Sequence, residues 1–219
     1  MIDLSNCKPF ARGGNRMCFQ HPFFPNRCIK TMIPGRIAEL RRRATWYKRL
    51  AGNSHFDDNL REVTGYKQRA LRNSAPDNVV WQHLPRWYGV TATSEGPGAV
   101  SELIQDDYGQ PAMTLEVYLQ NFGLNPRIRG ALNRFCVWLR TTGVLTKNLL
   151  PHNLVICEKS EHPELYLIDG LGCAAAIPLP EYFEAPRQHY VERRIERMWK
   201  RIHWELSGRN IPWKTAEKL

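Results

Sequence analysis

One polar loop, set between an amphipathic helix and two short apolar strands, constrains this chain more than any other feature. Residues 126–139 carry apolar side chains at helical spacing, and residues 154–168 hold two apolar runs of strand length. The loop between them ends at Asn153, and the second run is followed by Asp169. The order of these elements, more than any single residue, predicts both the fold and the site.

The loop resembles the catalytic loop of protein kinases, His-Arg-Asp-Leu-x-x-x-Asn, without its carboxylate. Leu149, Pro151 and Asn153 keep the frame. Asn148 stands where the catalytic aspartate would position the acceptor hydroxyl, and an amide cannot take up a proton as a carboxylate can. Asn153 and Asp169 would supply oxygen ligands, which Mg²⁺ prefers. The loop therefore indicates nucleotide binding and argues against ordinary phosphotransfer.

Three features upstream follow in the order that kinases use. Gly13 and Gly14 lie in the turn of a predicted hairpin, where the missing Cβ lets backbone amides approach a phosphate. Lys30 lies on the next predicted strand and would place a positive charge on phosphates. Glu62, on a predicted helix, would hold that lysine extended. Together with the loop they predict a site for ATP and Mg²⁺.

Each residue taken alone has a plainer interpretation. Gly13-Gly14 is a common turn, Lys30 and Glu62 suit a solvated surface, and Asn153 could bond its own backbone. Their order along the chain favours the kinase-like interpretation.

We predict an α+β, protein-kinase-like fold with a β-rich N-terminal lobe and a compact, truncated helical C-terminal lobe. One domain would span residues 1–219, with lobes of 1–105 and 106–219 joined near Asp106-Asp107. Strands are expected within residues 17–32, 83–90 and 99–104, with a turn at residues 95–98. Helices are expected within residues 36–50, 57–66, 115–119, 126–139 and 191–202, with caps at Asp57 or Asp58, at Thr114 and at Asn125.

The chain resembles the PhoP regulatory network protein YrbL family of Gram-negative bacteria over nearly its whole length. The matching segments are Gly13-Gly14-Asn15-Arg16, His21-Pro22, Arg27-Cys28-Ile29-Lys30, Arg61-Glu62 with Tyr66, Leu84-Pro85-Arg86-Trp87-Tyr88-Gly89, Val144-Leu145-Thr146 through Asn153, and Asp169-Gly170-Leu171-Gly172 with Ile177-Pro178-Leu179. This resemblance implies a kinase-like fold and a cytoplasmic protein linked to envelope-stress regulation.

The chain also departs from standard kinases. Gly170-Leu171 stands where Phe-Gly would follow the aspartate, and Pro178, Pro180 and Pro186 interrupt the stretch before the final helix. The residues after Pro180 are too few for the usual peptide-docking helices. A protein-substrate groove of the usual kind is therefore not expected.

Composition narrows the class of partner. The net charge of +10 and the pI near 9.5 favour phosphate-rich partners: nucleotides, or an anionic acceptor or protein partner that the sequence does not identify. Six scattered cysteines without a Cys-x-x-Cys pair, no secretory signal and no apolar run of membrane length indicate a cytoplasmic protein.

Three functions remain open on this basis. The first is an atypical or degenerate kinase-like protein, or pseudokinase, that binds Mg-ATP, with Asp106, Asp107 or His152 as candidates to replace the missing base. The second is a kinase of small molecules or of lipopolysaccharide sugars. The third is a non-enzymatic adaptor or nucleic-acid binder that uses the basic residues 36–49; nucleic acid is the less favoured partner, because such a helix is usually a solvated surface.

Overall fold

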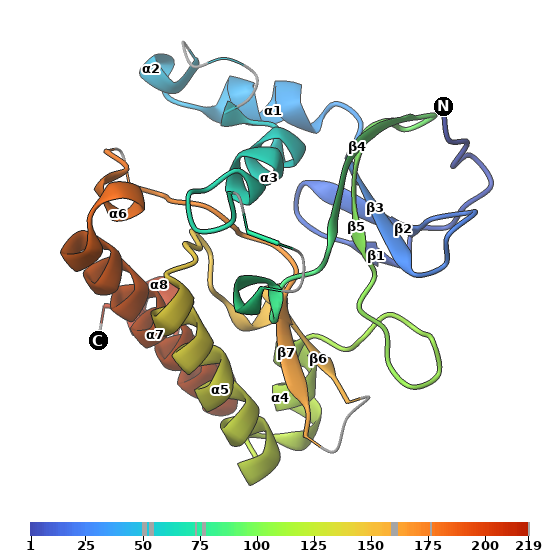
Figure 1. Cartoon of the computed structure of the whole chain (residues 1–219). Helices are drawn as coiled ribbons and strands as arrows, with labels where there is room; N and C mark the ends of the chain where they lie inside the picture. The colour runs from blue at the N-terminus through green and yellow to red at the C-terminus, as the bar shows by residue number, and fades with distance from the viewer. Residues whose placement is uncertain are drawn as a thin grey trace. The chain divides into compact units, whose positions relative to one another are not determined.

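The computed structural model describes residues 1–49, 52, 55–72, 74–75, 78–158, 162–175 and 177–218; the side chains of Tyr47 and Lys48 lie outside the described part. The chain forms two units, one of residues 1–66 and 86–103, the other of residues 67–85 and 104–219 (Figure 1). The predicted lobes 1–105 and 106–219 of a single domain stay a prediction.

The first unit is built on a five-stranded antiparallel sheet. The strands are β1 (Ala11–Arg12), β2 (Arg16–Gln20), β3 (Arg27–Met32), β4 (Trp87–Thr93) and β5 (Gly96–Glu102), in the order β1-β2-β3-β5-β4. Phe19, Ile29 and Val100 are paired across three strands and form a small core with Leu4. Because side chains alternate along a strand, Lys30 faces the other side of the sheet.

The turn predicted at residues 95–98 is wrong, because β5 begins at Gly96 and the turn lies at Ser94-Glu95. The Thr93 hydroxyl stabilises it by donating to the Gly96 carbonyl at 2.6 Å and accepting from the Glu95 amide at 3.1 Å. Pro97 lies beyond the last residue pair between β3 and β5, so its missing N–H costs no bond to β3. Gly96 and Pro97 therefore lie at the start of β5, although the sequence predicted that they form a turn.

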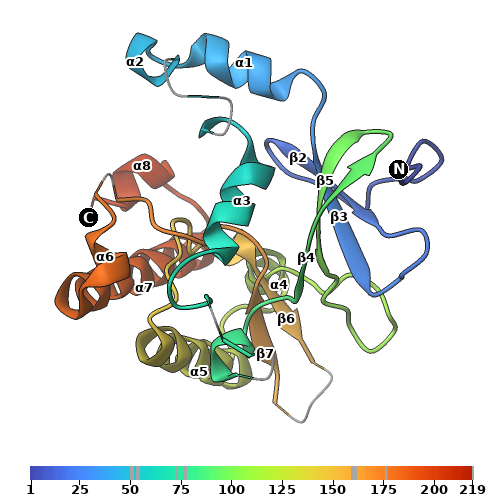
Figure 2. The same ribbon diagram turned by 45° about the horizontal axis from the view of Figure 1, so that its top comes forward.

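Helices α1 (Arg36–Arg43) and α2 (Trp46–Arg49) replace the single helix predicted within residues 36–50, of which Leu50 lies outside the described residues. Ala44 is extended and ends α1. The Arg49 guanidinium donates to the carbonyls of Ala44 and Arg42 at 2.8 and 2.7 Å. Carbonyls at the end of a helix have no hydrogen-bond partner within the helix, so these contacts stabilise the end of α1. In Figures 1 and 2, α1 and α2 lie away from the sheet of their unit, and α1 has no buried residue.

The third helix of this unit, α3 (Asp58–Tyr66), starts as predicted. The Asp57 carboxylate accepts from the amides of Asn59 and Leu60 at 2.8 and 3.3 Å, so Asp57 caps the helix. The inward side of α3 carries Asn59, Glu62 and Tyr66.

The second unit is mainly helical. Its elements are η2 (Val79–Trp81), α4 (Leu115–Phe122), α5 (Pro126–Thr142), η3 (Pro151–Asn153), β6 (Leu154–Cys157), β7 (Glu164–Leu167), α6 (Leu179–Tyr182), α7 (Glu184–Leu206) and α8 (Trp213–Ala216). The caps predicted at Thr114 and Asn125 are confirmed. None of the described helices is long and apolar enough to span a membrane.

Two amphipathic helices form the core of this unit, and they lie side by side in Figures 1 and 2. The predicted inward residues of both are buried: Ile128, Leu132, Phe135 and Leu139 on α5, and Val191, Ile195, Met198 and Ile202 on α7. Pro186 does not interrupt the stretch before the final helix, because it lies in the first turn of α7, where its missing N–H is tolerated.

Candidate functional site

Lys30 and Glu62 form a buried ion pair within the first unit. The Lys30 Nζ donates to the Glu62 Oε1 at 2.8 Å, and the two side chains are 7% and 4% exposed. Helix α3 packs on β3 and β5, which sets Glu62 above Lys30. Because an unpaired buried charge is costly, the pair holds the ammonium group in one place. Their part in nucleotide binding stays a prediction.

Sequence reasoning missed Arg16, which shares the same carboxylate. Its guanidinium forms an ion pair with the Glu62 Oε2 and donates to the Asn59 Oδ1 at 3.3 Å. The Asn59 amide in turn donates to the Lys30 carbonyl at 3.0 Å. Only the strand register of the structure explains the contact: Cys18 pairs with Lys30, and Arg16 lies two residues before Cys18 on the same side of the sheet.

The glycine turn lies at the tip of the β1–β2 hairpin, where the Gly13 amide donates to the Arg16 carbonyl at 2.9 Å. Neither Gly13 nor Gly14 has a positive φ. A Cβ at Gly13 would meet nothing closer than 3.8 Å, and a Cβ at Gly14 would meet nothing within 4 Å. Packing around the turn therefore does not explain the two glycines, and their contact with a phosphate stays a prediction.

In the second unit, the polar loop pairs with the segment after β7. The amides of Lys147 and Gly172 donate to the carbonyls of Gly170 and Leu145, both at 2.8 Å. Gly170 has a φ of +84°, and a Cβ there would lie 2.9 Å from the Asn148 carbonyl oxygen. Glycine is thus required at this position, because the two segments approach so closely.

Asn153 and Asp169 are brought together by the antiparallel pair of β6 and β7, since Asn153 precedes β6 and Asp169 follows β7. The Ile168 amide donates to the Asn153 carbonyl at 2.9 Å, which places Asp169 one residue beyond that pair. The Asn153 Nδ2 donates to the Asn148 carbonyl at 2.8 Å, so its Oδ1 is the atom left for a metal ion. The Asp169 Oδ1 accepts from the Gly170 amide at 2.6 Å.

Asn148 has a cationic neighbour that the sequence did not indicate. The Arg197 Nη1, from α7, donates to the Asn148 Oδ1 at 3.4 Å. Arg197 also forms an ion pair with Glu217 near the end of the chain. The neutral Asn148 amide suits this position, because it accepts a hydrogen bond from Arg197 without forming an ion pair. A carboxylate at the same position would form an ion pair with Arg197.

The three groups suggested as a replacement base have different surroundings. The Asp106 Oδ1 accepts from the amides of Tyr108 and Gln110, both at 2.9 Å, and so stabilises a turn. Asp107 is exposed. The His152 Nδ1 lies 4.0 Å from a Glu116 oxygen, and burial lowers the pKa of His152, which favours the neutral imidazole.

The predicted site residues thus fall into two groups. Gly13, Gly14, Lys30 and Glu62 lie in the first unit, and Asn148, Asn153 and Asp169 in the second. The first group offers backbone amides and a fixed cation, which suit phosphates. The second offers two oxygen ligands, and Mg²⁺ commonly takes one or two ligands from protein while phosphates and water supply the rest. Within the described residues there is no cluster of three or more His, Cys, Asp or Glu side chains suited to a metal ion.

The sequence matches a protein family over residues 2–206. The family is described as PhoP regulatory network protein YrbL. YrbL of Escherichia coli (strain K12) is 27% identical over 210 residues, which cover 92% of this chain and 86% of that protein. YrbL of Shigella flexneri matches to the same extent.

Solved structures of the PknI kinase domain from Mycobacterium tuberculosis resemble this chain in fold. One double-mutant form has a TM-score of 0.52 at 13% identity and covers 94% of this chain and 76% of that one. Another PknI structure has a TM-score of 0.50 at 13% identity, with coverages of 90% and 73%. The α+β architecture, with an antiparallel sheet in its N-terminal part and helices in its C-terminal part, is therefore protein-kinase-like. The chain belongs to the PhoP regulatory network protein YrbL family.

Proposed function

We propose that this protein binds ATP with Mg²⁺ as an atypical or degenerate kinase-like protein of the PhoP regulatory network. The observation that carries the proposal is the buried Lys30–Glu62 pair, with Nζ and Oε1 2.8 Å apart. Burying a lysine on a central strand costs desolvation free energy that an exposed lysine does not lose. In a kinase-like fold, the binding of phosphates by this lysine explains why it is buried.

The residues of the second unit support the same proposal. Asn153 and Asp169 would hold Mg²⁺, which supplies charge neutralisation at the phosphates. Asn148 would hydrogen-bond an acceptor hydroxyl without taking its proton. Losing a general base typically lowers the rate about 10²–10⁴-fold, so slow turnover is compatible with this loop.

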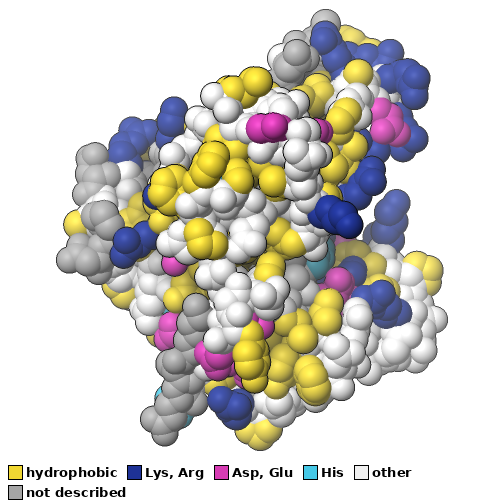
Figure 3. Space-filling view, turned by 90° about the vertical axis from the view of Figure 1, so that its right-hand side faces the viewer, with side chains coloured by type: hydrophobic (Ala, Val, Ile, Leu, Met, Phe, Trp, Pro, Cys, Tyr) yellow, Lys and Arg dark blue, Asp and Glu magenta, His cyan; other side chains and the backbone are white. Residues whose placement is uncertain are grey.

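Two further parts of the proposal concern place and partners. All six cysteines are free thiols, which fits the reducing cytoplasm proposed for the chain. Figure 3 shows Lys and Arg side chains gathered at the upper right of one face, with smaller groups elsewhere on it. Nucleotide and an anionic acceptor are the partners that we propose, because an excess of positive charge favours phosphate-bearing molecules.

The test compares two variants that act in different ways. Lys30→Ala removes a charge from the phosphates, so ATP binding should weaken with or without metal. Asp169→Ala removes a metal ligand, so it should abolish mainly the increment that Mg²⁺ adds. Calorimetric titration with ATP, with and without Mg²⁺, measures both.

Lys8→Ala and Glu196→Ala are matched controls, because each removes a charge of the same sign at an exposed position outside the predicted site. Both controls should bind like the parent. If Lys30→Ala and Asp169→Ala also bind like the parent, the assignment of the nucleotide site is wrong.

A further inference from the structure

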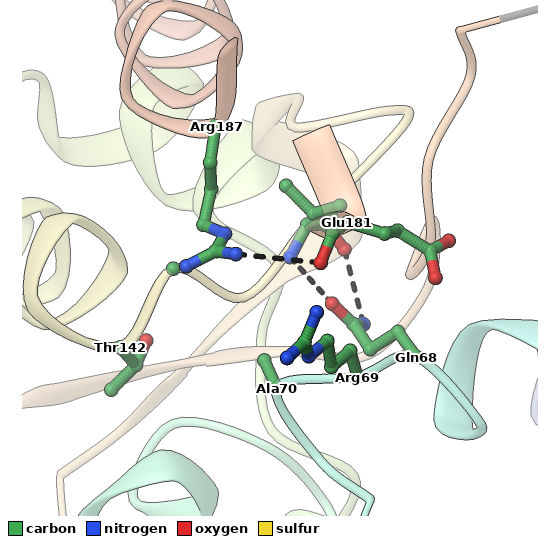
Figure 4. A pocket seen from close by; sticks show the side chains of 8 residues that line it. Gln68, Arg69, Ala70, Thr142, Glu181 and Arg187 are labelled. Atoms are coloured by element: carbon green, nitrogen blue, oxygen red, sulfur yellow. Dashed lines mark hydrogen bonds between the residues drawn. The ribbon is translucent and has the colours of Figure 1, made fainter. Parts of the chain in front are cut away.

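A cavity of about 210 Å³ lies in the second unit, at the ends of α5 and α7 (Figure 4). Its walls come from residues 68–70, from residues 142–145, and from Glu181 and Arg187. A second hollow of about 390 Å³ shares Arg69 and Glu181 with the first and adds Arg72 and Tyr182. Because they share these residues, the two hollows adjoin; we call the smaller one the narrow part and the larger one the wide hollow.

The narrow part contains two guanidinium groups without an acidic partner. The Arg187 Nε donates to the Pro180 carbonyl at 3.0 Å, and its Nη2 donates to the Glu181 carbonyl at 3.3 Å. Both acceptors are neutral carbonyls. Among the described residues, the half-buried Arg187 guanidinium forms no ion pair with a carboxylate. The exposed Arg69 makes no side-chain hydrogen bond or ion pair within the described part of the chain. In Figure 4 both guanidinium groups point into the cavity, and the Glu181 carboxylate points away from Arg187.

The surrounding backbone holds this arrangement in place. Gly143 has a φ of +63°, and a Cβ there would lie 2.5 Å from the Arg187 Cδ, so glycine is needed for Arg187 to pass over the end of α5. The Gln68 Oε1 accepts from the Leu145 amide at 2.7 Å, and the Gln68 Nε2 donates to the Leu145 carbonyl at 3.3 Å. Because Gln68 is buried, this pair of hydrogen bonds fixes the segment that carries Arg69.

We propose that this site binds a phosphate monoester of a small hydroxyl-bearing molecule. The phosphate would lie between Arg69 and Arg187, since guanidinium groups bind tetrahedral oxyanions with charge-assisted, often bidentate hydrogen bonds. The hydroxyl-bearing part would extend into the wide hollow. There the Glu181 carboxylate can accept from hydroxyl groups, and the exposed Tyr182 offers a ring face. This inference does not depend on nucleotide binding elsewhere in the chain.

The test is calorimetric titration with inorganic phosphate and with glucose 6-phosphate, at constant ionic strength kept with potassium chloride. Arg69→Gln should weaken the binding of both ligands about ten-fold or more, as expected when a hydrogen bond to a charged group is lost. Arg129→Gln is the matched control, because it removes the same charge from an exposed side chain outside the cavity. Equal binding by the two variants, or no binding of phosphate by the parent, overturns the site.

Two further measurements separate this site from the proposed nucleotide site and test the wide hollow. Arg69→Gln should bind Mg-ATP like the parent in the same titration; a loss of ATP binding that matches its loss of phosphate binding would place the anion at the nucleotide site and refute the inference. Glucose 6-phosphate should bind more tightly than inorganic phosphate, and Glu181→Ala, which removes the acceptor for hydroxyl groups, should remove that preference. If the two ligands bind equally, the hydroxyl-bearing class of ligand is wrong.

Discussion

At the scale of single residues, the proposed function depends most on Asn148. By its resemblance to the kinase loop, Asn148 stands where a catalytic aspartate would be, and Asn153 and Gly170 contact its backbone. Arg197 lies close enough to donate to its side-chain oxygen. A carboxylate at this position would therefore regain proton acceptance but would also pair with Arg197, which lowers its pKa and its basicity.

We predict that Asn148→Asp raises ATP turnover ten-fold or more, within the general-base range of about 10²–10⁴. Adding Arg197→Gln should raise it further, because the new carboxylate is then no longer paired. Steady-state release of ADP measures both variants. Flat or lower turnover with weaker ATP affinity would mean that the site uses a neutral residue for chemistry of its own.

A second residue-scale prediction concerns His83, which is buried against Phe135 and Trp138. Burial lowers the pKa of His83, and its Nδ1 lies 2.7 Å from the Leu165 carbonyl. The lowered pKa means that folding favours the neutral form of His83. The contribution of His83 to the free energy of unfolding is therefore fully present above the ordinary pKa of about 6.5, and it is lost as the pH drops below that value.

The urea concentration at the midpoint of unfolding should therefore decrease when the pH is lowered from 7.5 to 5.5. The decrease should be larger in the parent than in His83→Phe. His189→Gln, at an exposed position, is the matched control and should keep the parent's pH dependence. Identical pH dependence in parent and His83→Phe would assign the effect to other groups.

Residues differ in how far the sequence could predict them. Lys30 and Glu62 could be predicted as partners because a strand lysine and a helix glutamate follow in a known order. Arg16 could not, since its side chain looks like any exposed arginine until the β2–β3 register is known. Arg197 lies 49 positions from Asn148 along the chain, and only the packing of α7 brings them together.

At the scale of elements, helices were more predictable than turns. Capping residues and apolar periodicity located α3, α4, α5 and α7, because both signals are local. The β4–β5 turn was misplaced, because glycine and proline also occur at strand ends where a neighbouring strand stops. The break between α1 and α2 at Ala44 was missed, although Thr45 is a residue type that favours a helix start, and a contact from Arg49 stabilises the break.

The basic helix α1 supports an element-scale prediction. It has no buried residue, so replacing Arg41, Arg42 and Arg43 with Ser should leave the melting temperature within about 2 °C of the parent, as expected for surface changes. ATP binding should be unchanged, and binding to an anionic acceptor or partner should weaken. Collapse of the fold, seen by circular dichroism, would show that this helix is part of the core.

At the scale of the whole molecule, the chain joins a sheet unit that carries a buried lysine to a helical unit that carries two oxygen ligands. The α+β class and the kinase-like fold were predictable because the elements occur in a recognisable order. The affiliation of residues 67–85 with the second unit was not, since it depends on contacts such as Gln68 with Leu145 that are distant in sequence.

The central claim is that this molecule binds ATP through Mg²⁺, and thermal unfolding of the unmodified protein tests it most directly. Ligand at about 100 times its dissociation constant adds roughly 2.7 kcal/mol to the free energy of unfolding. For a chain of this length we expect a rise of about 5–10 °C in melting temperature with millimolar Mg-ATP, and a smaller rise with ATP alone. GTP with Mg²⁺ serves as the comparison for base preference. No shift with Mg-ATP in a well-folded sample would contradict the account.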